Sequence, residues 1–386
     1  MFRRTIFSSE HEQFRDSVRR FTAEHVTPFH DQWEEDGQIS REAWKAAGDH
    51  GILCPALPEE YGGAGADFLY STIIIEEMAR ANASGPGFYL HSDIVAPYIL
   101  NYGTEEQRKR WLPKMATGER IGAIAMTEPS GGSDVQAIRT TARREGDQFV
   151  IDGQKVFITN GQLSDLVIVA CKTDATAGAK GVSLIVVERE HEGFRRGRNL
   201  KKIGYKAQDT SELFFDNVRV PVTNLLGTEG RGFVSLMEQL PQERLIQAIR
   251  CISTIEAALD WTVEYVNERQ AFGRPISGFQ NTRFTLADVK AESTMMRVFV
   301  DRCIEMHLAG ELDAVDAAIA KLLSSEMMGN LLDKCLQMFG GYGYMWEYPI
   351  ARAWADARMS RIAGGTCEIM REIVGRSMFG NRARDS

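Results

Sequence analysis

Glu243 is the residue whose type and position point most directly to chemistry. It lies in the stretch SLMEQLPQERLIQAI, where one face of a helix would carry Leu236, Leu240, Glu243 and Ile246. That spacing places Glu243 on the apolar stripe of an amphipathic helix, where an unpaired carboxylate is costly to bury. Glu243 is therefore either a working acid or base, or a helix-end charge that follows Pro241 and interacts with the helix dipole.

Two glycine-rich stretches could hold a ligand. The first, AMTEPSGGSD at residues 125–134, combines three hydroxyl side chains with two glycines, so its backbone N–H groups can approach a polar or anionic ligand. The second, QMFGGYGYMWEYPIARAWAD at residues 337–356, places glycines inside a helical pattern, which suggests close backbone approach to a flat or charged group. Each stretch also has an ordinary interpretation, as an interdomain turn and as a helix end followed by aromatic packing.

Several well-defined active-site motifs are missing from the sequence. It contains no GxGxxG, Walker A, GxSxG or HExxH pattern, which argues against nicotinamide, ATP, ester-hydrolase and zinc-protease chemistry. The six cysteines are scattered, with no CxxC pair and no histidines at metal-ligand spacing. We therefore expect reduced thiols and no metal site.

The composition is that of an ordinary globular protein. Hydrophobic residues make up 44% and charged residues 25% of the 386 residues. The formal net charge of -8 gives no reason to expect binding to nucleic acid or to an anionic membrane surface. No apolar run approaches the ~18 residues of a membrane span, and no apolar leader is apparent. We expect no membrane insertion and a cytoplasmic location.

The chain divides into three compositional zones, and we predict an α+β protein. Residues 1–120 are mostly helical in pattern, and a capping box at Ser9 and Glu12 is expected to open the first helix. Residues 121–226 contain short β-rich runs with no helix of normal length, which favours an antiparallel β barrel or sandwich. Residues 227–386 show long helical periodicity with short connections, which indicates a C-terminal four-helix bundle.

Both glycine-rich stretches together identify a family resemblance. The chain resembles the acyl-CoA dehydrogenases from PEEYGG at residues 58–63 through the final helices. The stretch 125–134 matches the first signature of that family. The second signature is matched at Gln337, Gly340, Gly341, Gly343, Tyr344, Glu347, Arg352 and Asp356. LPQERL and GYMWEYPIA look most like the long-chain members.

The resemblance implies a flavoprotein that holds FAD non-covalently. Residues similar to those beside the isoalloxazine ring are Met126, Thr127, Ser133, Phe157, Ile158 and Thr159, although many relatives have Trp at the position of Phe157. Residues resembling those that hold FAD from a neighbouring subunit are Arg269, Gln280, Gln337, Gly340 and Gly341. Thr366 and Glu368 also match positions close to FAD. Such sharing implies a homo-oligomer, and the usual state of the family is a tetramer.

The resemblance also implies the reaction. Members oxidise acyl-CoA to trans-2-enoyl-CoA in fatty acid β-oxidation and other lipid metabolism. In many relatives the base is a glutamate at the position of Gly364, whereas isovaleryl and long-chain enzymes carry it on the helix that contains Glu243. Glu243 would then remove the α-proton while hydride passes to flavin N5. The backbone N–H of Gly364 and a ribityl hydroxyl would hold the thioester oxygen.

The same resemblance suggests the remaining partners. Substrate-binding positions would be Ser133, Pro241, Gln242, Arg244 and Gly365, and an electron-transfer flavoprotein would reoxidise the enzyme. Three alternatives stay open at this point. The chain could be a branched-chain enzyme for isovaleryl or terpenoid acyl-CoA, an acyl-CoA oxidase that passes electrons to oxygen, or a silent flavoprotein that lacks the glutamate at Gly364.

Overall fold

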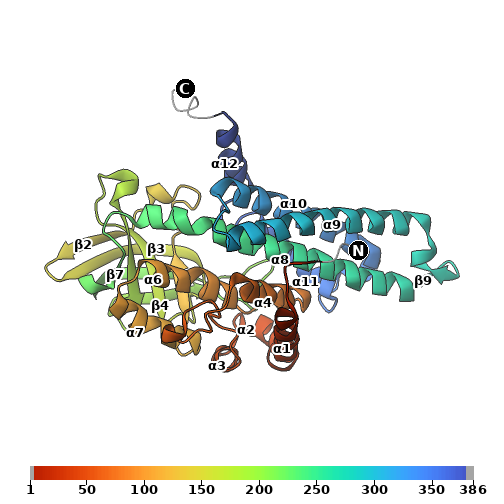
Figure 1. The fold of residues 1–386 in the computed structure, drawn as a ribbon, viewed down its shortest axis with the longest axis horizontal. Helices are drawn as coiled ribbons and strands as arrows, with labels where there is room; N and C mark the ends of the chain where they lie inside the picture. The colour runs from red at the N-terminus through yellow and green to blue at the C-terminus, as the bar shows by residue number, and fades with distance from the viewer. Residues whose placement is uncertain (1–3, 380–386) are drawn as a thin grey trace.

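The computed structural model describes residues 4–379 and has three parts arranged along one long axis (Figure 1). Figure 1 shows the sheet at one end of this axis and the β9 hairpin at the other, with α8 running between them. The N-terminal helices pack below α8, and α9 and α10 lie alongside it. The α+β architecture predicted from the sequence is confirmed, with helical, sheet and helical parts in that order.

The N-terminal part is built from short helices around the buried helix α4. Its elements are α1 (Ser9–His25), α2 (His30–Asp36), α3 (Arg41–Asp49), α4 (Phe68–Arg80), α5 (Phe88–Leu90), η3 (His91–Val95), α6 (Ala96–Tyr102) and α7 (Glu105–Ala116). The capping box of α1 lies one residue earlier than predicted. Ser8 is the N-cap and His11 completes the box, because the chain enters the helix from the extended conformation of Ser8.

The middle part is one sheet with two apolar faces. Its strands are β1 (Gly122–Ala125), β2 (Thr141–Glu145), β3 (Gln148–Thr159), β4 (Leu166–Lys172), β5 (Val182–Glu188), β6 (Phe194–Asn199), β7 (Thr210–Pro221) and β8 (Leu225–Leu226). They pair in the open order β6-β7-β3-β2-β4-β5-β8. Strands β4 and β5 are buried throughout, because alternate residues face the helical core and the core of the sheet itself.

Strand β4 departs from the antiparallel arrangement expected for this part, because it has parallel pairings with β1 and, at Thr141 opposite Lys172, with β2. β1 attaches to β4 in parallel, from Gly122 opposite Leu166 to Ala125 opposite Val169. Parallel strands need a crossover connection, and here β2 and β3 provide it. The AMTEPSGGSD stretch is the start of this crossover, so it leaves the sheet where β1 ends.

The C-terminal part is a helical bundle organised by one long helix. Its elements are α8 (Gly232–Glu268), β9 (Gln270–Ala271), β10 (Arg274–Pro275), α9 (Gln280–Leu308), α10 (Ala314–Phe339), α11 (Pro349–Ser360) and α12 (Cys367–Phe379). Helix α8 has 37 residues and packs against α4 of the N-terminal part as well as α9, α10 and α11. It therefore joins the two helical parts into one core.

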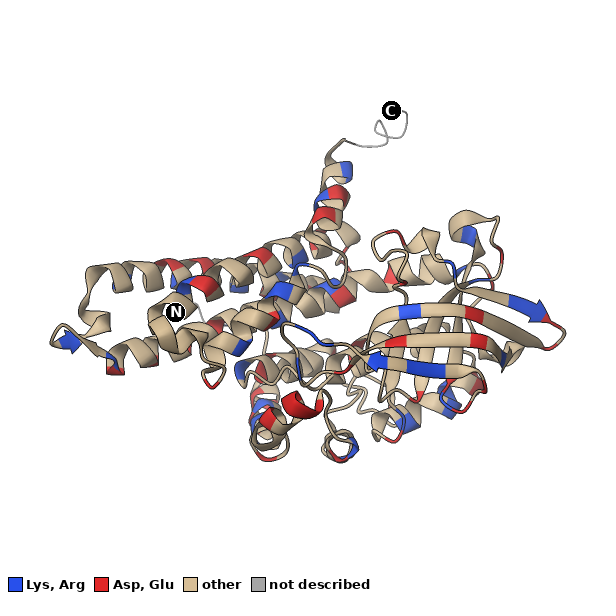
Figure 2. Cartoon of the chain, turned by 180° about the vertical axis from the view of Figure 1, so that it is seen from behind, with Lys and Arg blue, Asp and Glu red and all other residues tan. Residues whose placement is uncertain are grey.

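Surface charge and cysteine chemistry are ordinary for a globular protein. Figure 2 shows Lys and Arg interspersed with Asp and Glu along the helices and strands. Across residues 4–379, no helix is long and apolar enough to cross a membrane, and no cluster of three or more His, Cys, Asp or Glu could hold a metal ion. All six cysteines are free and buried.

A buried ion cluster at Glu76 fixes the relative position of three helices. Glu76 on α4 is fully buried and accepts hydrogen bonds from Arg4 at 2.9 Å, Arg15 of α1 at 2.8 Å and Arg297 of α9 at 2.9 Å. Burial alone would raise the pKa of Glu76, but these three arginines outweigh it and lower the pKa to about 2. The cluster therefore ties the N-terminal helices to the C-terminal bundle.

We expect Glu76→Gln to destabilise the protein by about 3 kcal/mol, since two buried arginines and the partly buried Arg4 each lose one of their carboxylate partners. Thermal unfolding followed by circular dichroism measures this loss. Glu305→Gln is the matched control, because Glu305 pairs with Arg302 on an exposed face of α9 and such pairs contribute about 1 kcal/mol or less. Equal melting temperatures for the two variants would contradict this role of Glu76.

Candidate active site

Glu243 lies inside α8 and not at its end. The helix starts at Gly232, about three turns earlier, and Pro241 lies within it. The helix-end interpretation of Glu243 is therefore wrong. The side chain is only 7% exposed, so the apolar stripe inferred from the sequence does carry a buried carboxylate.

The hydrogen-bond partner of Glu243 is Tyr98 of α6. The Tyr98 hydroxyl donates to Glu243 Oε1 at 3.0 Å. Burial raises the pKa of the Glu243 carboxyl to about 7, although the Tyr98 hydrogen bond and the charge of Arg244 act in the opposite direction. A carboxyl group in this state can take up a proton and release it near neutral pH. Sequence analysis missed Tyr98, because 145 residues separate it from Glu243.

The loop between α11 and α12 faces the same side of α8. A Cβ atom added to Gly364 would lie 3.7 Å from Cγ of Gln247, which is one helical turn beyond Glu243. Gly364 and Gly365 have φ angles of 68° and 95°, in the left-handed region that favours glycine. Lys321 holds the loop by donating a hydrogen bond to the Gly365 carbonyl. Within residues 4–379, the Gly364 N–H has no hydrogen-bond acceptor.

Thr366 and Glu368 lie where this loop enters α12. Thr366 Oγ1 accepts a hydrogen bond from the Ile369 N–H at 3.3 Å. Glu368 is exposed in the first turn of α12, and hydrogen bonds from its own backbone N–H and from Thr366 lower its pKa. Both residues thus occupy a helix N-terminus, which favours a nearby anion.

The predicted substrate residues around Glu243 point in different directions. The Gln242 side-chain amide donates to the Asp93 carbonyl at 2.6 Å, so it secures α8 against η3. Arg244 is buried and donates to the Ala314 carbonyl at 3.4 Å, toward the start of α10. Pro241 is partly buried in α8. Of the residues 241–244, Glu243 is the one that accepts the hydrogen bond from Tyr98.

A buried ion pair anchors the first glycine-rich loop to the sheet. Lys155 of β3 donates to Glu128 Oε1 and to the Met126 carbonyl, both at 2.9 Å. The Val156 N–H donates to the Thr127 carbonyl at 3.0 Å. Glu128 also accepts the backbone N–H groups of residues 139 and 140. Sequence analysis missed this pair, although Lys155 falls on the inward-facing alternation of its strand.

Phe157 projects from the sheet beside this loop. Its φ angle is 61°, and the pairing of β3 with β7 shifts register between Lys155 and Ile158, so a bulge turns the side chain outward. The ring is 65% exposed. Ile158 is buried, Thr159 is partly buried, and Ser133 is exposed on the neighbouring loop. Together the loop and Phe157 form an aromatic and polar surface next to the sheet.

The second group of predicted cofactor residues gathers at the other end of the molecule. Arg269, Gln337, Gly340 and Gly341 line one cavity of about 580 Å³. Cβ atoms added to Gly340 and Gly341 would meet nothing within 4 Å, so the backbone there is open to a ligand. Gln280 is exposed at the start of α9. Figure 1 places this end, marked by β9, far from the sheet, so one chain does not bring the two groups together.

Comparison with known proteins identifies the family. Models of the N-terminal, middle and C-terminal domains of acyl-CoA dehydrogenases match residues 8–119, 123–218 and 230–379. The chain is 50% identical to the mitochondrial long-chain specific acyl-CoA dehydrogenase of Rattus norvegicus over 97% of this chain and 88% of the relative. It is 36% identical to a mitochondrial isovaleryl-CoA dehydrogenase of Solanum tuberosum over 97% of this chain and 92% of the relative.

A solved structure agrees with these sequence relatives. The crystal structure of an acyl-CoA dehydrogenase from Geobacillus kaustophilus superposes with a TM-score of 0.95 and 48% identity, covering 97% of this chain and 99% of that chain. Fold, domain order and sequence identity thus agree over nearly the whole described chain. The chain belongs to the acyl-CoA dehydrogenases, a family of FAD-dependent oxidoreductases.

Proposed function

We propose that this chain converts a saturated acyl-CoA to the trans-2-enoyl-CoA with Glu243 as the catalytic base. The observation that carries the proposal is the buried Glu243 carboxyl, whose pKa is raised to about 7. It lies one helical turn from Gln247, whose Cγ would be 3.7 Å from a Cβ atom added to Gly364. A carboxylate without a cationic partner within 4.0 Å among the described residues is a stronger base than one held in an ion pair.

Each protein group has a defined task in the proposed reaction. The Glu243 carboxylate takes the α-proton of the thioester, and the Tyr98 hydroxyl orients that carboxylate. The free N–H of Gly364 donates to the thioester oxygen as negative charge develops there. The electron pair of the broken α-C–H bond becomes the second bond of the new double bond. FAD, when bound, supplies the acceptor for the β-hydrogen, which leaves with its electron pair.

The residues present fit FAD at two places. Phe157 offers an exposed aromatic surface beside the Met126 and Thr127 backbone, which Lys155 holds in place. The cavity at the far end of α8 offers an arginine and an open glycine backbone, which suit an anionic, elongated ligand. Since the two places lie at opposite ends of the chain, we propose that FAD spans two subunits of a homo-oligomer, with a tetramer as the favoured assembly.

The acyl group and electron acceptor are proposed from relatives. The long-chain enzyme of Rattus norvegicus at 50% identity favours a long, straight acyl chain over the isovaleryl enzymes at 36%. An electron-transfer flavoprotein is the proposed acceptor. Rapid oxygen consumption during turnover would instead assign the chain to the acyl-CoA oxidases.

We expect Glu243→Gln to slow anaerobic bleaching of the flavin by acyl-CoA about 10²–10⁴-fold, because the substitution removes the base. The holoprotein is mixed with straight and branched saturated acyl-CoAs while flavin absorbance is recorded. The matched control is Glu238→Gln, since Glu238 also accepts a hydrogen bond from a tyrosine, Tyr102, on the exposed side of α8. Bleaching of Glu243→Gln at the wild-type rate would overturn the assignment of the base.

The raised pKa of Glu243 gives two opposite pH dependences. Flavin reduction by wild type should rise between pH 6 and 8, as the carboxyl with a folded pKa of about 7 loses its proton. Stability changes the other way. The unfolded pKa is about 4.3, so above pH 7 the buried charge destabilises the fold by the full amount of roughly 3–4 kcal/mol, and this cost disappears as the pH falls toward 4. Glu243→Gln should therefore raise the melting temperature at pH 8 and change it little at pH 4.5, and equal shifts at both values would contradict the raised pKa.

A further inference from the structure

Arg250 is another buried ion on α8, seven residues after Glu243. It is 7% exposed, and its guanidinium donates to two uncharged groups, the Tyr89 hydroxyl at 3.0 Å and Gln247 Oε1 at 2.6 Å. Among residues 4–379, no carboxylate forms an ion pair with it within 4.0 Å, and Asp356 interacts with its charge from further away. The buried Arg297, in contrast, binds both Glu76 and Glu256. A buried guanidinium without a counter-charge is costly unless its hydrogen bonds are satisfied.

One donor of Arg250 is left without a partner beside a small cavity. Its Nε atom is buried and unpaired in the described structure. The cavity of about 40 Å³ is lined by Arg250, Tyr89 and Asp356 together with apolar side chains such as Ile74, Met78 and Phe88. That volume holds one or two small groups the size of a water molecule. Arg250 offers a donor there, and Asp356 offers a carboxylate.

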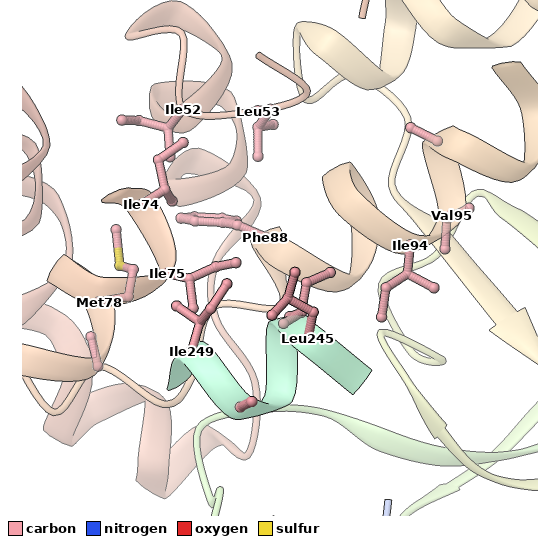
Figure 3. Close-up of a cluster of buried hydrophobic side chains, with 14 of the residues drawn as sticks. Ile52, Leu53, Ile74, Ile75, Met78, Phe88, Ile94, Val95, Leu245 and Ile249 are labelled. Atoms are coloured by element: carbon pink, nitrogen blue, oxygen red, sulfur yellow. The ribbon is translucent and has the colours of Figure 1, made fainter. Parts of the chain in front are cut away.

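The cavity and Glu243 lie between the same two segments of the chain, which form the two walls of the site. One wall is α8, and the other runs from α5 to α6. Tyr89 joins the walls at Arg250, and Tyr98 joins them at Glu243. Figure 3 shows Phe88, Ile75, Leu245 and Ile249 in one cluster of buried side chains, so the same segments also pack through apolar residues.

Gln247 lies between the thioester end of the site and Arg250. A Cβ atom added to Gly364 would lie 3.7 Å from the Cγ of Gln247, and Oε1 of Gln247 accepts the hydrogen bond from Arg250. Glu243 and Arg250 are seven residues apart, so about 10 Å separates them along the helix axis. That distance corresponds to roughly eight carbon–carbon bonds of an extended acyl chain.

We propose that Arg250 and Asp356 recognise a hydroxyl group about eight carbon–carbon bonds along the acyl chain, so that this enzyme takes hydroxyacyl-CoA substrates. The inference rests on the function proposed above. A hydroxyl oxygen accepts the free Nε–H of Arg250, and its proton can be donated to Asp356. A terminal methyl group would leave the Arg250 Nε–H unpaired, whereas Asp356 already accepts the Tyr205 N–H. A terminal carboxylate would meet the negative charge of Asp356.

The test compares two acyl-CoAs that differ by one oxygen. Anaerobic flavin reduction is measured with decanoyl-CoA, 10-hydroxydecanoyl-CoA and the ω-carboxyl analogue, using the holoenzyme. We expect kcat/KM for the hydroxylated substrate to exceed that for decanoyl-CoA by about tenfold, the effect of one hydrogen bond to a charged group. The same ratio should appear in the binding constants measured by calorimetry with Glu243→Gln.

Variants of the cavity separate recognition from general damage. In Arg250→Leu, kcat/KM for 10-hydroxydecanoyl-CoA should be close to that for decanoyl-CoA, and decanoyl-CoA should still reduce the flavin. Tyr89→Phe keeps the charge of Arg250 but removes the hydroxyl that positions it, so this variant should show a smaller preference for the hydroxylated substrate than wild type. This second variant provides the test if Arg250→Leu does not fold. Arg80→Leu is the control, because Arg80 pairs with Glu256 between α4 and α8 and does not line the cavity.

The possible outcomes distinguish this inference from the proposed function. If decanoyl-CoA bleaches the wild-type flavin and the hydroxylated substrate gives no advantage, the hydroxyl inference is wrong and the proposed function stands. A preference for the ω-carboxyl analogue that disappears in Arg250→Leu would also overturn the hydroxyl assignment, in favour of an anionic ligand. If none of the three substrates bleaches or binds, the proposed function itself fails.

Discussion

The need to keep one carboxylate buried without an ion pair governs this structure. Glu243 can act as a strong base because burial raises its pKa to about 7, and a nearby cation in hydrogen-bond range would cancel that effect. Among the described residues, the hydrogen-bond donor to Glu243 is the neutral hydroxyl of Tyr98, which orients the carboxylate without neutralising it. Such an arrangement is destabilising by itself, so the surrounding core must hold α6 and α8 together.

The other ion pairs of the protein hold the walls of the site in position. Glu76 draws arginines from the N-terminus, α1 and α9 onto α4, which packs against α8. Lys155 and Glu128 fix the loop that begins at Met126 to the sheet. In both clusters the charges are paired and buried, which makes them structural. Glu243 and Arg250 lack such pairing, and both lie on the face of α8 that the acyl group is proposed to follow.

The sequence predicted what local patterns determine. Helical and alternating periodicities separated the three parts, and the spacing of apolar residues around Glu243 was enough to place it on the buried face of a helix. Such local patterns do not predict which distant segments contact each other. Tyr98 could not be assigned to Glu243 from the sequence, and the parallel pairing of β1 with β4 depends on a crossover. Nothing in the pattern around Arg250 distinguished it from other arginines in helices. These features depend on contacts between segments distant in the chain, which periodicity does not encode.

The most direct test of Glu243 as the base is the exchange of α-hydrogens with solvent, measured without any oxidation. A thioester with no β-hydrogen, such as 3,3-dimethylbutyryl-CoA, is incubated with the holoprotein in D₂O, and deuterium at the α-carbon is followed by NMR. Wild type should incorporate deuterium and Glu243→Gln should not, although both bind the thioester. Incorporation at the same rate in both proteins would contradict the account, because another group would then be removing the α-proton.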